Sequence, residues 1–179
     1  LTYKESVDNY GSDKPDLRND KNNQNELAFT WIVDFPMFEK TDDGNIQAAH
    51  HPFCSIKPED KDKFMKGEDL LNIRANSYDL VLNGYELSSG SIRIHDRAEQ
   101  KQVFKLLNIS EEEQQEKFGH MLEAFTYGAP PHGGFAPGID RIVMLLQGEP
   151  NIREVIAFPK TREGRDLMMN APSEVSDKQ

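Results

Sequence analysis

The chain has 179 residues, of which 36% are hydrophobic, so it can form one substantial core, and we expect one domain or a piece of one. Its formal net charge of -10 argues against broad, nonspecific binding to a nucleic-acid backbone, although it is compatible with a narrow site for one end of a nucleic acid. A single cysteine, Cys54, excludes an internal disulfide, and neither a targeting signal nor an apolar run of the ~20 residues that cross a bilayer is present, so we expect a cytoplasmic protein without a membrane partner.

The chain begins with a short helix and a polar linker. Residues 1–10 favour a helix with Leu1, Ser6 and Val7 turned inward. The stretch NDKNNQN, residues 19–25, has no apolar side chain to bury and predicts a linker.

A strand, a turn and a charged region follow. FTWIVDF, residues 29–35, is rich in β-branched and aromatic residues, stops before Pro36 and predicts a buried strand. TDDGN, residues 41–45, predicts a turn that leads toward HHPF, residues 50–53. Residues 57–69 are highly charged, so we expect them to be solvated.

The most informative stretch is YDLVLNGYELSSGSIRIHD, residues 78–96. Asn83-Gly84 predicts a two-residue hairpin turn, because both residues accept positive φ angles. Asp79 and Glu86 would then point to the same side as diagonal neighbours, roughly 7–8 Å apart at Cα. The register that this turn predicts pairs Leu82 with Tyr85, Val81 with Glu86, and Asp79 with Ser88.

Arg93 joins this face only if the second strand contains a bulge. Glu86 and Arg93 are separated by an odd number of residue steps, which in a regular strand sends them to opposite faces. Ser88-Ser89-Gly90 fits a bulge, whose extra residue would return Arg93 to the face of Glu86. Two carboxylates suit a hard divalent cation, and an arginine suits a carboxylate or phosphate. The hairpin therefore predicts half of a site for a metal and an anionic substrate; the alternative is a solvated strand face with ordinary charge pairs.

Helices follow the hairpin. Residues 97–107 and 110–125 have helical periodicity, and the second of these ranges opens with a capping box. Residues 128–138 are too rich in glycine and proline for a helix, and predict a loop with a short strand around Phe135. A third helix is expected over residues 139–146, which Gly148 and Pro150 end. Strands before helices, without βαβ alternation, indicate an α+β fold with an antiparallel β-sheet flanked by helices. The apolar stripe of the first helix is Val103, Leu106 and Leu107.

GGFAPGIDR, residues 133–141, is a glycine-rich approach to a helix with Arg141 in its first turn. Glycines let a flat base or a phosphate approach the backbone, free N–H groups at a helix start attract anions, and Arg141 supplies a positive fork. The alternative is a tight strand-to-helix corner with a surface arginine. The segment is not a P-loop, because the Lys-Ser/Thr ending is missing.

Several long motifs occur together and in a fixed order. Together they resemble the catalytic domain of bacterial-type aspartyl-tRNA synthetase, a class II aminoacyl-tRNA synthetase, over nearly the whole chain. The resemblance implies that residues 1–18 and 29–179 belong to a partial class II catalytic core, with residues 19–28 as a polar linker where the family carries an inserted domain. The motifs are YGSDKPDLR at 10–18, WIVDFPMFE at 31–39, HHPF at 50–53, DLVLNGYELSSGSIRIHD at 79–96, YGAPPHGGFAPGIDR at 127–141 and VIAFPKT at 155–161.

The resemblance implies a role for each candidate site residue. Asp79 and Glu86 would hold Mg²⁺ on the phosphates of ATP. Arg93 would pair with the side-chain carboxylate of L-aspartate, and His50 and His51 would lie beside this amino acid. The residues implied to meet ATP are Glu86, Gly138, Ile139, Asp140 and Arg141, with Arg141 on the γ-phosphate; those implied to be catalytic are Glu86, Arg93 and Arg141.

The histidine pair has other interpretations. His50 and His51 could form a turn with one buried and one solvated ring. A zinc site that combines them with Cys54 is disfavoured, because no second group of ligands completes a tetrahedron.

The implied reaction has two steps. The α-carboxylate of aspartate attacks the α-phosphorus of ATP and releases pyrophosphate, and the 3′-terminal hydroxyl of tRNA then takes the aspartyl group. The family also has an anticodon-binding OB-fold, a homodimer-forming motif and an arginine on the α-phosphate, none of which has a counterpart in this chain. We therefore expect the chain alone to be inactive and most tRNA contacts to lie in other parts.

Two alternative functions are compatible with the sequence. One is an aspartate-activating paralogue that makes asparagine without tRNA. The other is a noncatalytic module that binds a nucleotide or an amino acid, for which loss of Glu86, Arg93 or Arg141 would be the usual sign; all three residues are present.

Overall fold

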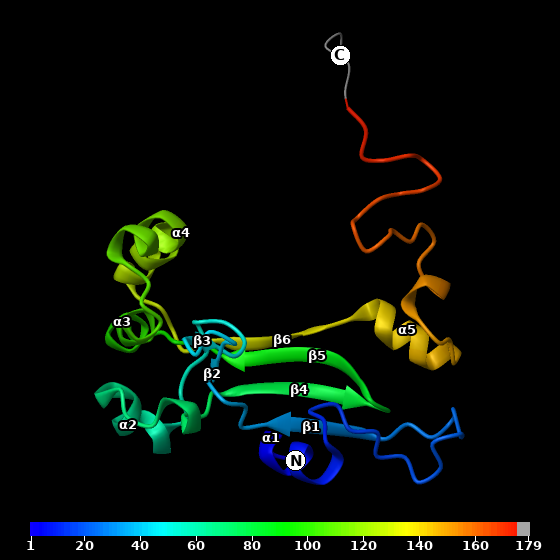
Figure 1. Cartoon of the computed structure of the whole chain (residues 1–179), viewed down its shortest axis with the longest axis horizontal. Coiled ribbons are helices and arrows are strands. Elements are labelled where there is room, and N and C mark those ends of the chain that lie inside the picture. Colours follow the sequence, from blue (N-terminus) through cyan, green and yellow to red (C-terminus); the bar gives the residue numbers. More distant parts are fainter. Residues whose placement is uncertain (175–179) are drawn as a thin grey trace. The chain divides into compact units, whose positions relative to one another are not determined.

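The computed structural model describes residues 1–174 and divides into two compact units, Leu1–Pro137 and a second unit that begins at Gly138. The first unit is built on a four-stranded antiparallel sheet with the strand order β1-β4-β5-β6 (Figure 1). Helices accompany the sheet, so the predicted α+β class is confirmed. The strands of this sheet are β1 (Phe29–Val33), β4 (Ser77–Leu82), β5 (Tyr85–Ile92) and β6 (Gly133–Pro137); β2 (Phe38–Lys40) and β3 (Ile46–Ala48) form a separate pair; the α-helices are α1 (Tyr3–Tyr10), α2 (Lys61–Lys66), α3 (Arg97–Leu106), α4 (Glu111–Ala124) and α5 (Ile139–Gln147).

Helix α1 is confirmed, but only part of its predicted inward face is correct. Thr2 and Glu5 form a capping box at its start, and Ser6 is buried with its hydroxyl donating to the Ser12 carbonyl at 2.7 Å. Leu1 and Val7 are exposed instead. Leu1 lies outside the helix because its carbonyl accepts a hydrogen bond from the N–H of Val33 at the end of β1.

Strand β1 is confirmed, whereas the prediction that it is buried is wrong for one of its faces. Ile32 is buried, but Phe29 and Trp31 are 56% and 45% exposed. Ile32 packs in a small cluster to which Tyr3 of α1 contributes, while Trp31 points to the other face and meets Tyr78 and Phe135 edge-on at ring distances of 6.0 and 6.1 Å. The strand alternates between the two faces because successive side chains of a strand point in opposite directions.

The hairpin forms at the predicted turn, but its bulge lies earlier than predicted. Leu82 faces Tyr85 and Val81 faces Glu86, as expected. The predicted pairing of Asp79 with Ser88 is wrong, because the register shifts between Leu80 and Val81 and leaves Leu87 as the extra residue. Asp79 consequently faces Ser89, and Ser88 faces Leu80.

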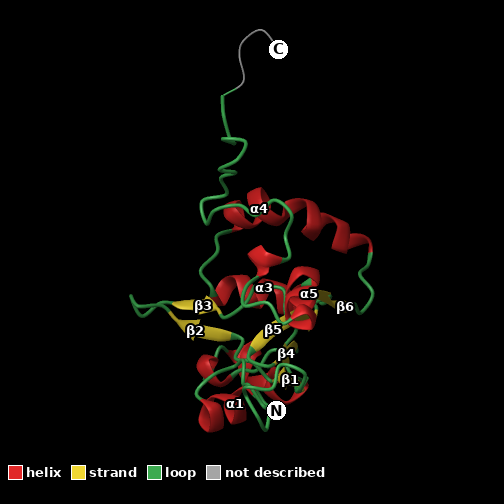
Figure 2. Ribbon diagram, turned by 90° about the vertical axis from the view of Figure 1, so that its right-hand side faces the viewer, coloured by secondary structure: helices red, strands yellow, loops and turns green. Residues whose placement is uncertain are grey.

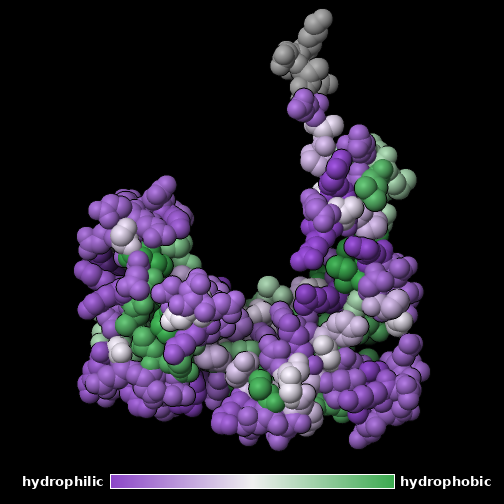
Figure 3. All heavy atoms as spheres, in the orientation of Figure 1, coloured by the Kyte–Doolittle hydropathy of each residue, from purple (hydrophilic) through white to green (hydrophobic). Residues whose placement is uncertain are grey.

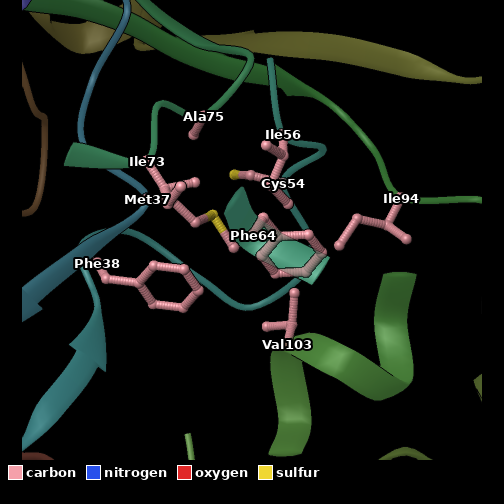
Figure 4. Close-up of a cluster of buried hydrophobic side chains, with 9 residues drawn as sticks. All are labelled: Met37, Phe38, Cys54, Ile56, Phe64, Ile73, Ala75, Ile94 and Val103. Carbon is pink, nitrogen blue, oxygen red and sulfur yellow. The ribbon is translucent and has the colours of Figure 1, made fainter. Parts of the chain in front are cut away.

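The main hydrophobic cluster of the first unit is shown in Figure 4. Phe64 of α2 is fully buried in it, so the prediction that residues 57–69 are solvated is wrong for Phe64, although most of the segment is exposed. Val103 of α3 also lies in the cluster, and Leu106 and Leu107 pack against it, as the predicted stripe requires. The buried members of the cluster are Met37, Phe38, Cys54, Ile56, Phe64, Ile73, Ala75, Ile94 and Val103.

Helices α3 and α4 form over the residues that the sequence predicts, and Ser110 caps α4. Asp96 caps α3, and the Ser110 hydroxyl accepts a hydrogen bond from the N–H of Glu113 at the start of α4. The two helices lie next to each other (Figure 2). They pack through Phe104 and Phe118, whose ring centroids are 5.5 Å apart in a stacked arrangement.

The polar segment at residues 19–28 has no helix or strand, yet it is attached to the hairpin turn. The N–H groups of Asn19 and Asp20 donate to the Glu26 carboxylate, and the side chain of Asn83 accepts from the N–H of Ala28 and donates to the Glu26 carbonyl. These contacts hold the segment against the turn. Its assignment as the position of an inserted domain, and the domain boundaries that follow from it, stay a prediction.

Helix α5 of the second unit spans Ile139–Gln147 and ends at Gly148 in the left-handed conformation, as predicted. Strand β6, which precedes it in the chain, includes Phe135 as expected. Most of the surface in view in Figure 3 is hydrophilic, in keeping with the charge of the chain. In the part of the chain that the structure describes, no helix is both long and apolar enough to cross a membrane.

Candidate functional site

Asp79 and Glu86 lie on the same face of the sheet. Glu86 faces Val81 across the hairpin, and Asp79 precedes Val81 by two positions on β4, so all three side chains point to one side. Asp79 is only 3% exposed, and its Oδ1 has no hydrogen-bond partner among the described residues. A buried carboxylate oxygen without a partner is costly, and such an atom is a candidate ligand for a cation.

The surroundings of Asp79 disfavour its negative charge. Burial raises the pKa of Asp79 above its ordinary value; a hydrogen bond from Ser89 and the charge of His50 oppose this shift, and the negative charges of Glu86 and Asp13 reinforce it. The site therefore has a deficit of positive charge, which a bound cation would remove.

The donor set fits a hard divalent cation such as Mg²⁺. Mg²⁺ is commonly held by one or two carboxylates together with substrate phosphates and water, and Asp79 with Glu86 supplies the two carboxylates. Within residues 1–174, no group of three acidic, histidine or cysteine side chains is arranged to hold a metal. The remaining ligands of a cation at this place would therefore come from a bound substrate and from water.

Arg93 directly follows β5 and continues the alternation of Ser89 and Ser91, so it lies on the face of Asp79. The bulge at Leu87 makes this possible, as the sequence required. Its backbone N–H donates to the His132 carbonyl at 2.9 Å, and its Nη1 donates to Nε2 of His51 at 2.7 Å. A guanidinium has five donors in a planar fork, more than one neutral imidazole can accept, so Arg93 is suited to receive an anion.

The two histidines point to different parts of the site. His51 contacts Arg93, and burial, followed by the positive charge of Arg93, lowers the pKa of His51 from 6.5 to about 4. His50 instead packs edge-on against Phe35 at 4.9 Å and lies close enough to Asp79 to influence its charge. The structure thus brings one histidine to Arg93 and the other near Asp79.

Two cavities lie in the first unit, one beside Arg93 and one between α3 and α4. The smaller, of about 180 Å³, has Arg93 and His132 in its wall, together with Gln100, whose buried Oε1 has no partner among the described residues. The larger, of about 490 Å³, lies between α3 and α4 and is lined by none of the predicted site residues.

The glycine-rich segment also has the expected local structure. Gly138 is the N-cap of α5, so the predicted ATP-contacting residues Ile139, Asp140 and Arg141 form the first turn of a helix. All three are exposed. A helix start of this kind is suited to bind a phosphate.

The sequence matches the family of class II tRNA synthetases for D, K and N, which are aspartate, lysine and asparagine, over residues 1–162. The chain belongs to this class II family. Its α+β fold is accordingly a partial class II catalytic core.

Curated relatives in this class II family include ligases for aspartate. The chain is 57% identical over 159 residues to the aspartate–tRNA(Asp/Asn) ligase of Symbiobacterium thermophilum, with 86% of this chain and 27% of the relative covered. It is 52% identical over 157 residues to the aspartate–tRNA ligase of Macrococcus caseolyticus, with 87% and 26% covered. The chain therefore spans about a quarter of the length of these relatives.

Solved structures of the class II family agree with the fold. The aspartyl-tRNA synthetase of Entamoeba histolytica superimposes with a TM-score of 0.62 at 25% identity, covering 91% of this chain and 32% of that structure.

Two residues of the site were not predicted from the class II motifs. Lys14 and Asp13 lie in YGSDKPDLR, which served only as a mark of the family. In the structure, Lys14 Nζ is 3.3 Å from Glu86 Oε2, and Asp13 influences the charge of Asp79. The charges of Asp13 and Lys14 were the available sequence signal for these contacts. Their partners, Asp79 and Glu86, are distant in the sequence, so the contacts themselves could not be predicted.

Proposed function

We propose that the protein is an aspartate–tRNA ligase, which activates L-aspartate with ATP to aspartyl-adenylate and transfers the aspartyl group to the 3′ end of tRNA. The observation that carries this proposal is the arrangement of Asp79, Glu86 and Arg93 on one face of a single hairpin, in a class II chain 57% identical to a named aspartate–tRNA ligase. Two acids and an arginine on one face match what the substrates ATP and aspartate require.

Asp79 and Glu86 are the proposed ligands of Mg²⁺. When bound, this ion would neutralise charge on the phosphates of ATP. The unpartnered Oδ1 of Asp79 supports this role, because a cation would satisfy it. Glu86 would orient the same ion from the opposite strand of the hairpin.

Arg93 is the proposed recognition residue for aspartate. Its guanidinium would form a charge-assisted pair with the side-chain carboxylate, which the neutral amide of asparagine cannot form. His51 accepts from Arg93 and is uncharged near neutral pH because of its lowered pKa, so it holds the guanidinium without neutralising it. His50 would lie beside the amino acid on the side of Asp79.

Gly138, Ile139, Asp140 and Arg141 are the proposed ATP-contacting residues. The backbone at the start of α5 would lie near the adenine, and Arg141 would bind the γ-phosphate. Catalysis would then come from positioning and charge stabilisation, without a covalent enzyme intermediate.

The remaining properties follow from the proposed function. We infer that the full-length protein works as a cytoplasmic homodimer and binds tRNA mainly through parts outside these residues. The segment at residues 19–28 would stand where the family carries an inserted domain.

The test is aspartate-dependent exchange between ATP and pyrophosphate by the full-length protein. We expect Glu86→Gln to abolish exchange, and Arg93→Lys to raise the KM for aspartate about 100-fold, roughly 2.7 kcal/mol, with little change in the KM for ATP. Lys117→Met is the matched control, since Lys117 pairs with Glu113 along the exposed surface of α4.

The outcomes separate the alternative functions. Formation of asparagine and AMP from aspartate, ATP and ammonia without tRNA would favour the paralogue, and binding of ATP and aspartate without exchange would favour a noncatalytic module. Charging assays with the aspartate tRNA and the asparagine tRNA then distinguish the two kinds of named relative.

A further inference from the structure

The loop at residues 12–18 is folded against the turn of the β4–β5 hairpin. A Cβ atom added to Gly84 would lie 3.7 Å from Cβ of Asp16 and 3.9 Å from the carbonyl oxygen of Lys14. Within the loop, Arg18 Nη2 donates to the Asp16 carboxylate at 2.6 Å, and the Lys14 N–H donates to the Ser12 hydroxyl at 3.0 Å. The loop therefore has a defined conformation, which presents Lys14 to the hairpin.

Lys14 lies beside one of the two carboxylates of the candidate metal site. Its Nζ is 3.3 Å from Glu86 Oε2, and the two side chains are 43% and 27% exposed. An ion pair with this exposure contributes little to the stability of a fold. Structural support therefore does not explain why Lys14 lies beside Glu86.

The negative charge of the second carboxylate, that of Asp79, is not balanced by Lys14. Asp79 is buried with an unpartnered Oδ1, and the charges of Glu86 and Asp13 add to the cost of its ionised form. Lys14 balances Glu86 but makes no ion pair with Asp79 among the described residues. A divalent cation between the two carboxylates would balance both, and it would then meet the ammonium group at Glu86.

We propose that Lys14 is a positioning residue that takes the place of the divalent cation at Glu86 and is exchanged for it when the metal binds. This inference rests on the proposed function, because it assumes that Asp79 and Glu86 are the metal ligands. The ammonium holds the Glu86 side chain near its binding position in the metal-free protein. Because the cation must displace it, Lys14 also weakens metal binding in the absence of ATP.

The test is a titration of the full-length protein with Mn²⁺ in the absence of ATP, followed by electron paramagnetic resonance of the free ion. We expect Lys14→Met to lower the Kd for Mn²⁺ at least about threefold, because an opposing positive charge is removed. Lys14→Arg keeps the charge and should bind Mn²⁺ like the wild type. Lys57→Met is the control: Lys57 pairs at 2.6 Å with Asp34, which is not one of the two proposed ligands, and its loss should leave the Kd unchanged.

Asp79→Asn separates this inference from the proposed function. If Asp79→Asn weakens Mn²⁺ binding while Lys14→Met leaves it unchanged or weaker, the metal site stands and the role of Lys14 is refuted. If the wild type and Asp79→Asn bind Mn²⁺ equally, or if neither binds it even when ATP is added, the metal ligands of the proposed function are wrong and the inference falls with them. Thermal unfolding of each variant checks that the fold is retained.

Discussion

His51 lies against the guanidinium of Arg93, and this contact determines its charge. Burial and the positive charge of Arg93 lower the pKa of His51 to about 4. A protonated imidazole at this place would repel the guanidinium and could not accept its hydrogen bond. The pair therefore works as one unit, in which a neutral ring orients a permanent cation.

The charge of His51 leads to a prediction for the pH dependence of stability. In the unfolded chain His51 takes up a proton near its ordinary pKa of 6.5, whereas in the folded protein it does so only near 4. Between these values the unfolded state binds more protons, so the free energy of unfolding falls as the pH is lowered from 6.5 to 4. Nuclear magnetic resonance should show no titration of the His51 ring above pH 5, and His51→Gln should reduce the loss of stability in this window. A His51 ring that titrates near 6.5 would contradict the contact with Arg93.

Asp79 leads to the opposite prediction for the pH dependence of stability. Burial raises its pKa, so above its ordinary pKa of 3.8 the folded state binds more protons than the unfolded state and stability falls as the pH rises. Without metal, Asp79→Asn should therefore stabilise the protein at pH 7 by on the order of 1 kcal/mol, and the gain should vanish below pH 3.8. Urea unfolding in the presence of a chelator measures this change, and Asp16→Asn is the comparison, because the Arg18 hydrogen bond lowers the pKa of Asp16 and its loss should destabilise.

Strands β5 and β6 pack so closely that one position between them excludes a side chain. A Cβ atom on Gly90 would lie 2.3 Å from the Gly134 carbonyl oxygen and 2.7 Å from Cβ of Phe135 and from the Tyr78 ring. The glycine is therefore required by space, since its backbone has an ordinary negative φ. This close approach aligns the strand that carries Glu86 with the strand that leads to α5.

Gly90→Ala should disrupt the pairing of β5 with β6. We expect a loss of about 2 kcal/mol or more, because the clash involves backbone atoms that cannot rotate away. Gly134→Ala is the matched control on the facing strand, since its Cβ would have nothing within 4 Å, and it should change the stability by less than about 1 kcal/mol. Equal effects of the two substitutions in urea unfolding would show that the strands can separate without cost.

The sequence predicted elements whose signals are local. The Asn83-Gly84 turn, the Ser110 cap and the Gly148 helix end were all confirmed, because each depends on residues within a few positions of one another. The bulge was placed late, at residues 88–90 instead of Leu87, because serine and glycine suggested flexibility while burial of a leucine decided the register.

Contacts between residues that are distant in the sequence could not be predicted from local sequence signals. Phe64 looked like part of a charged surface segment, yet it is fully buried because Phe38 and Val103, from other parts of the chain, enclose it. The contact of Lys14 with Glu86 depends in the same way on how the loop at residues 12–18 folds over the hairpin. Such partners are set by tertiary packing, and no local pattern reports them.

The charge of the whole molecule bears on its proposed substrate. The chain carries a formal net charge of -10 and spans about a quarter of the length of its curated relatives. A surface of this charge repels the phosphate backbone of tRNA, so the affinity for tRNA must come mainly from other parts of such an enzyme. The proposed role of this chain is confined to the small substrates and the tRNA end.

The chain by itself should therefore neither bind nor charge tRNA. We expect no binding of the aspartate tRNA to the 179-residue chain below about 10 µM at physiological salt, because nonspecific affinity requires phosphate contacts from basic residues. We also expect no aspartate-dependent ATP–pyrophosphate exchange, since the resemblance to the family implies that the arginine for the α-phosphate lies outside these residues. Filter binding and the exchange assay, each with the full-length protein as positive control, measure the two expectations. Exchange by the chain alone would mean that its own residues are enough to stabilise the transition state. Tight tRNA binding would mean that a local basic surface outweighs the overall charge.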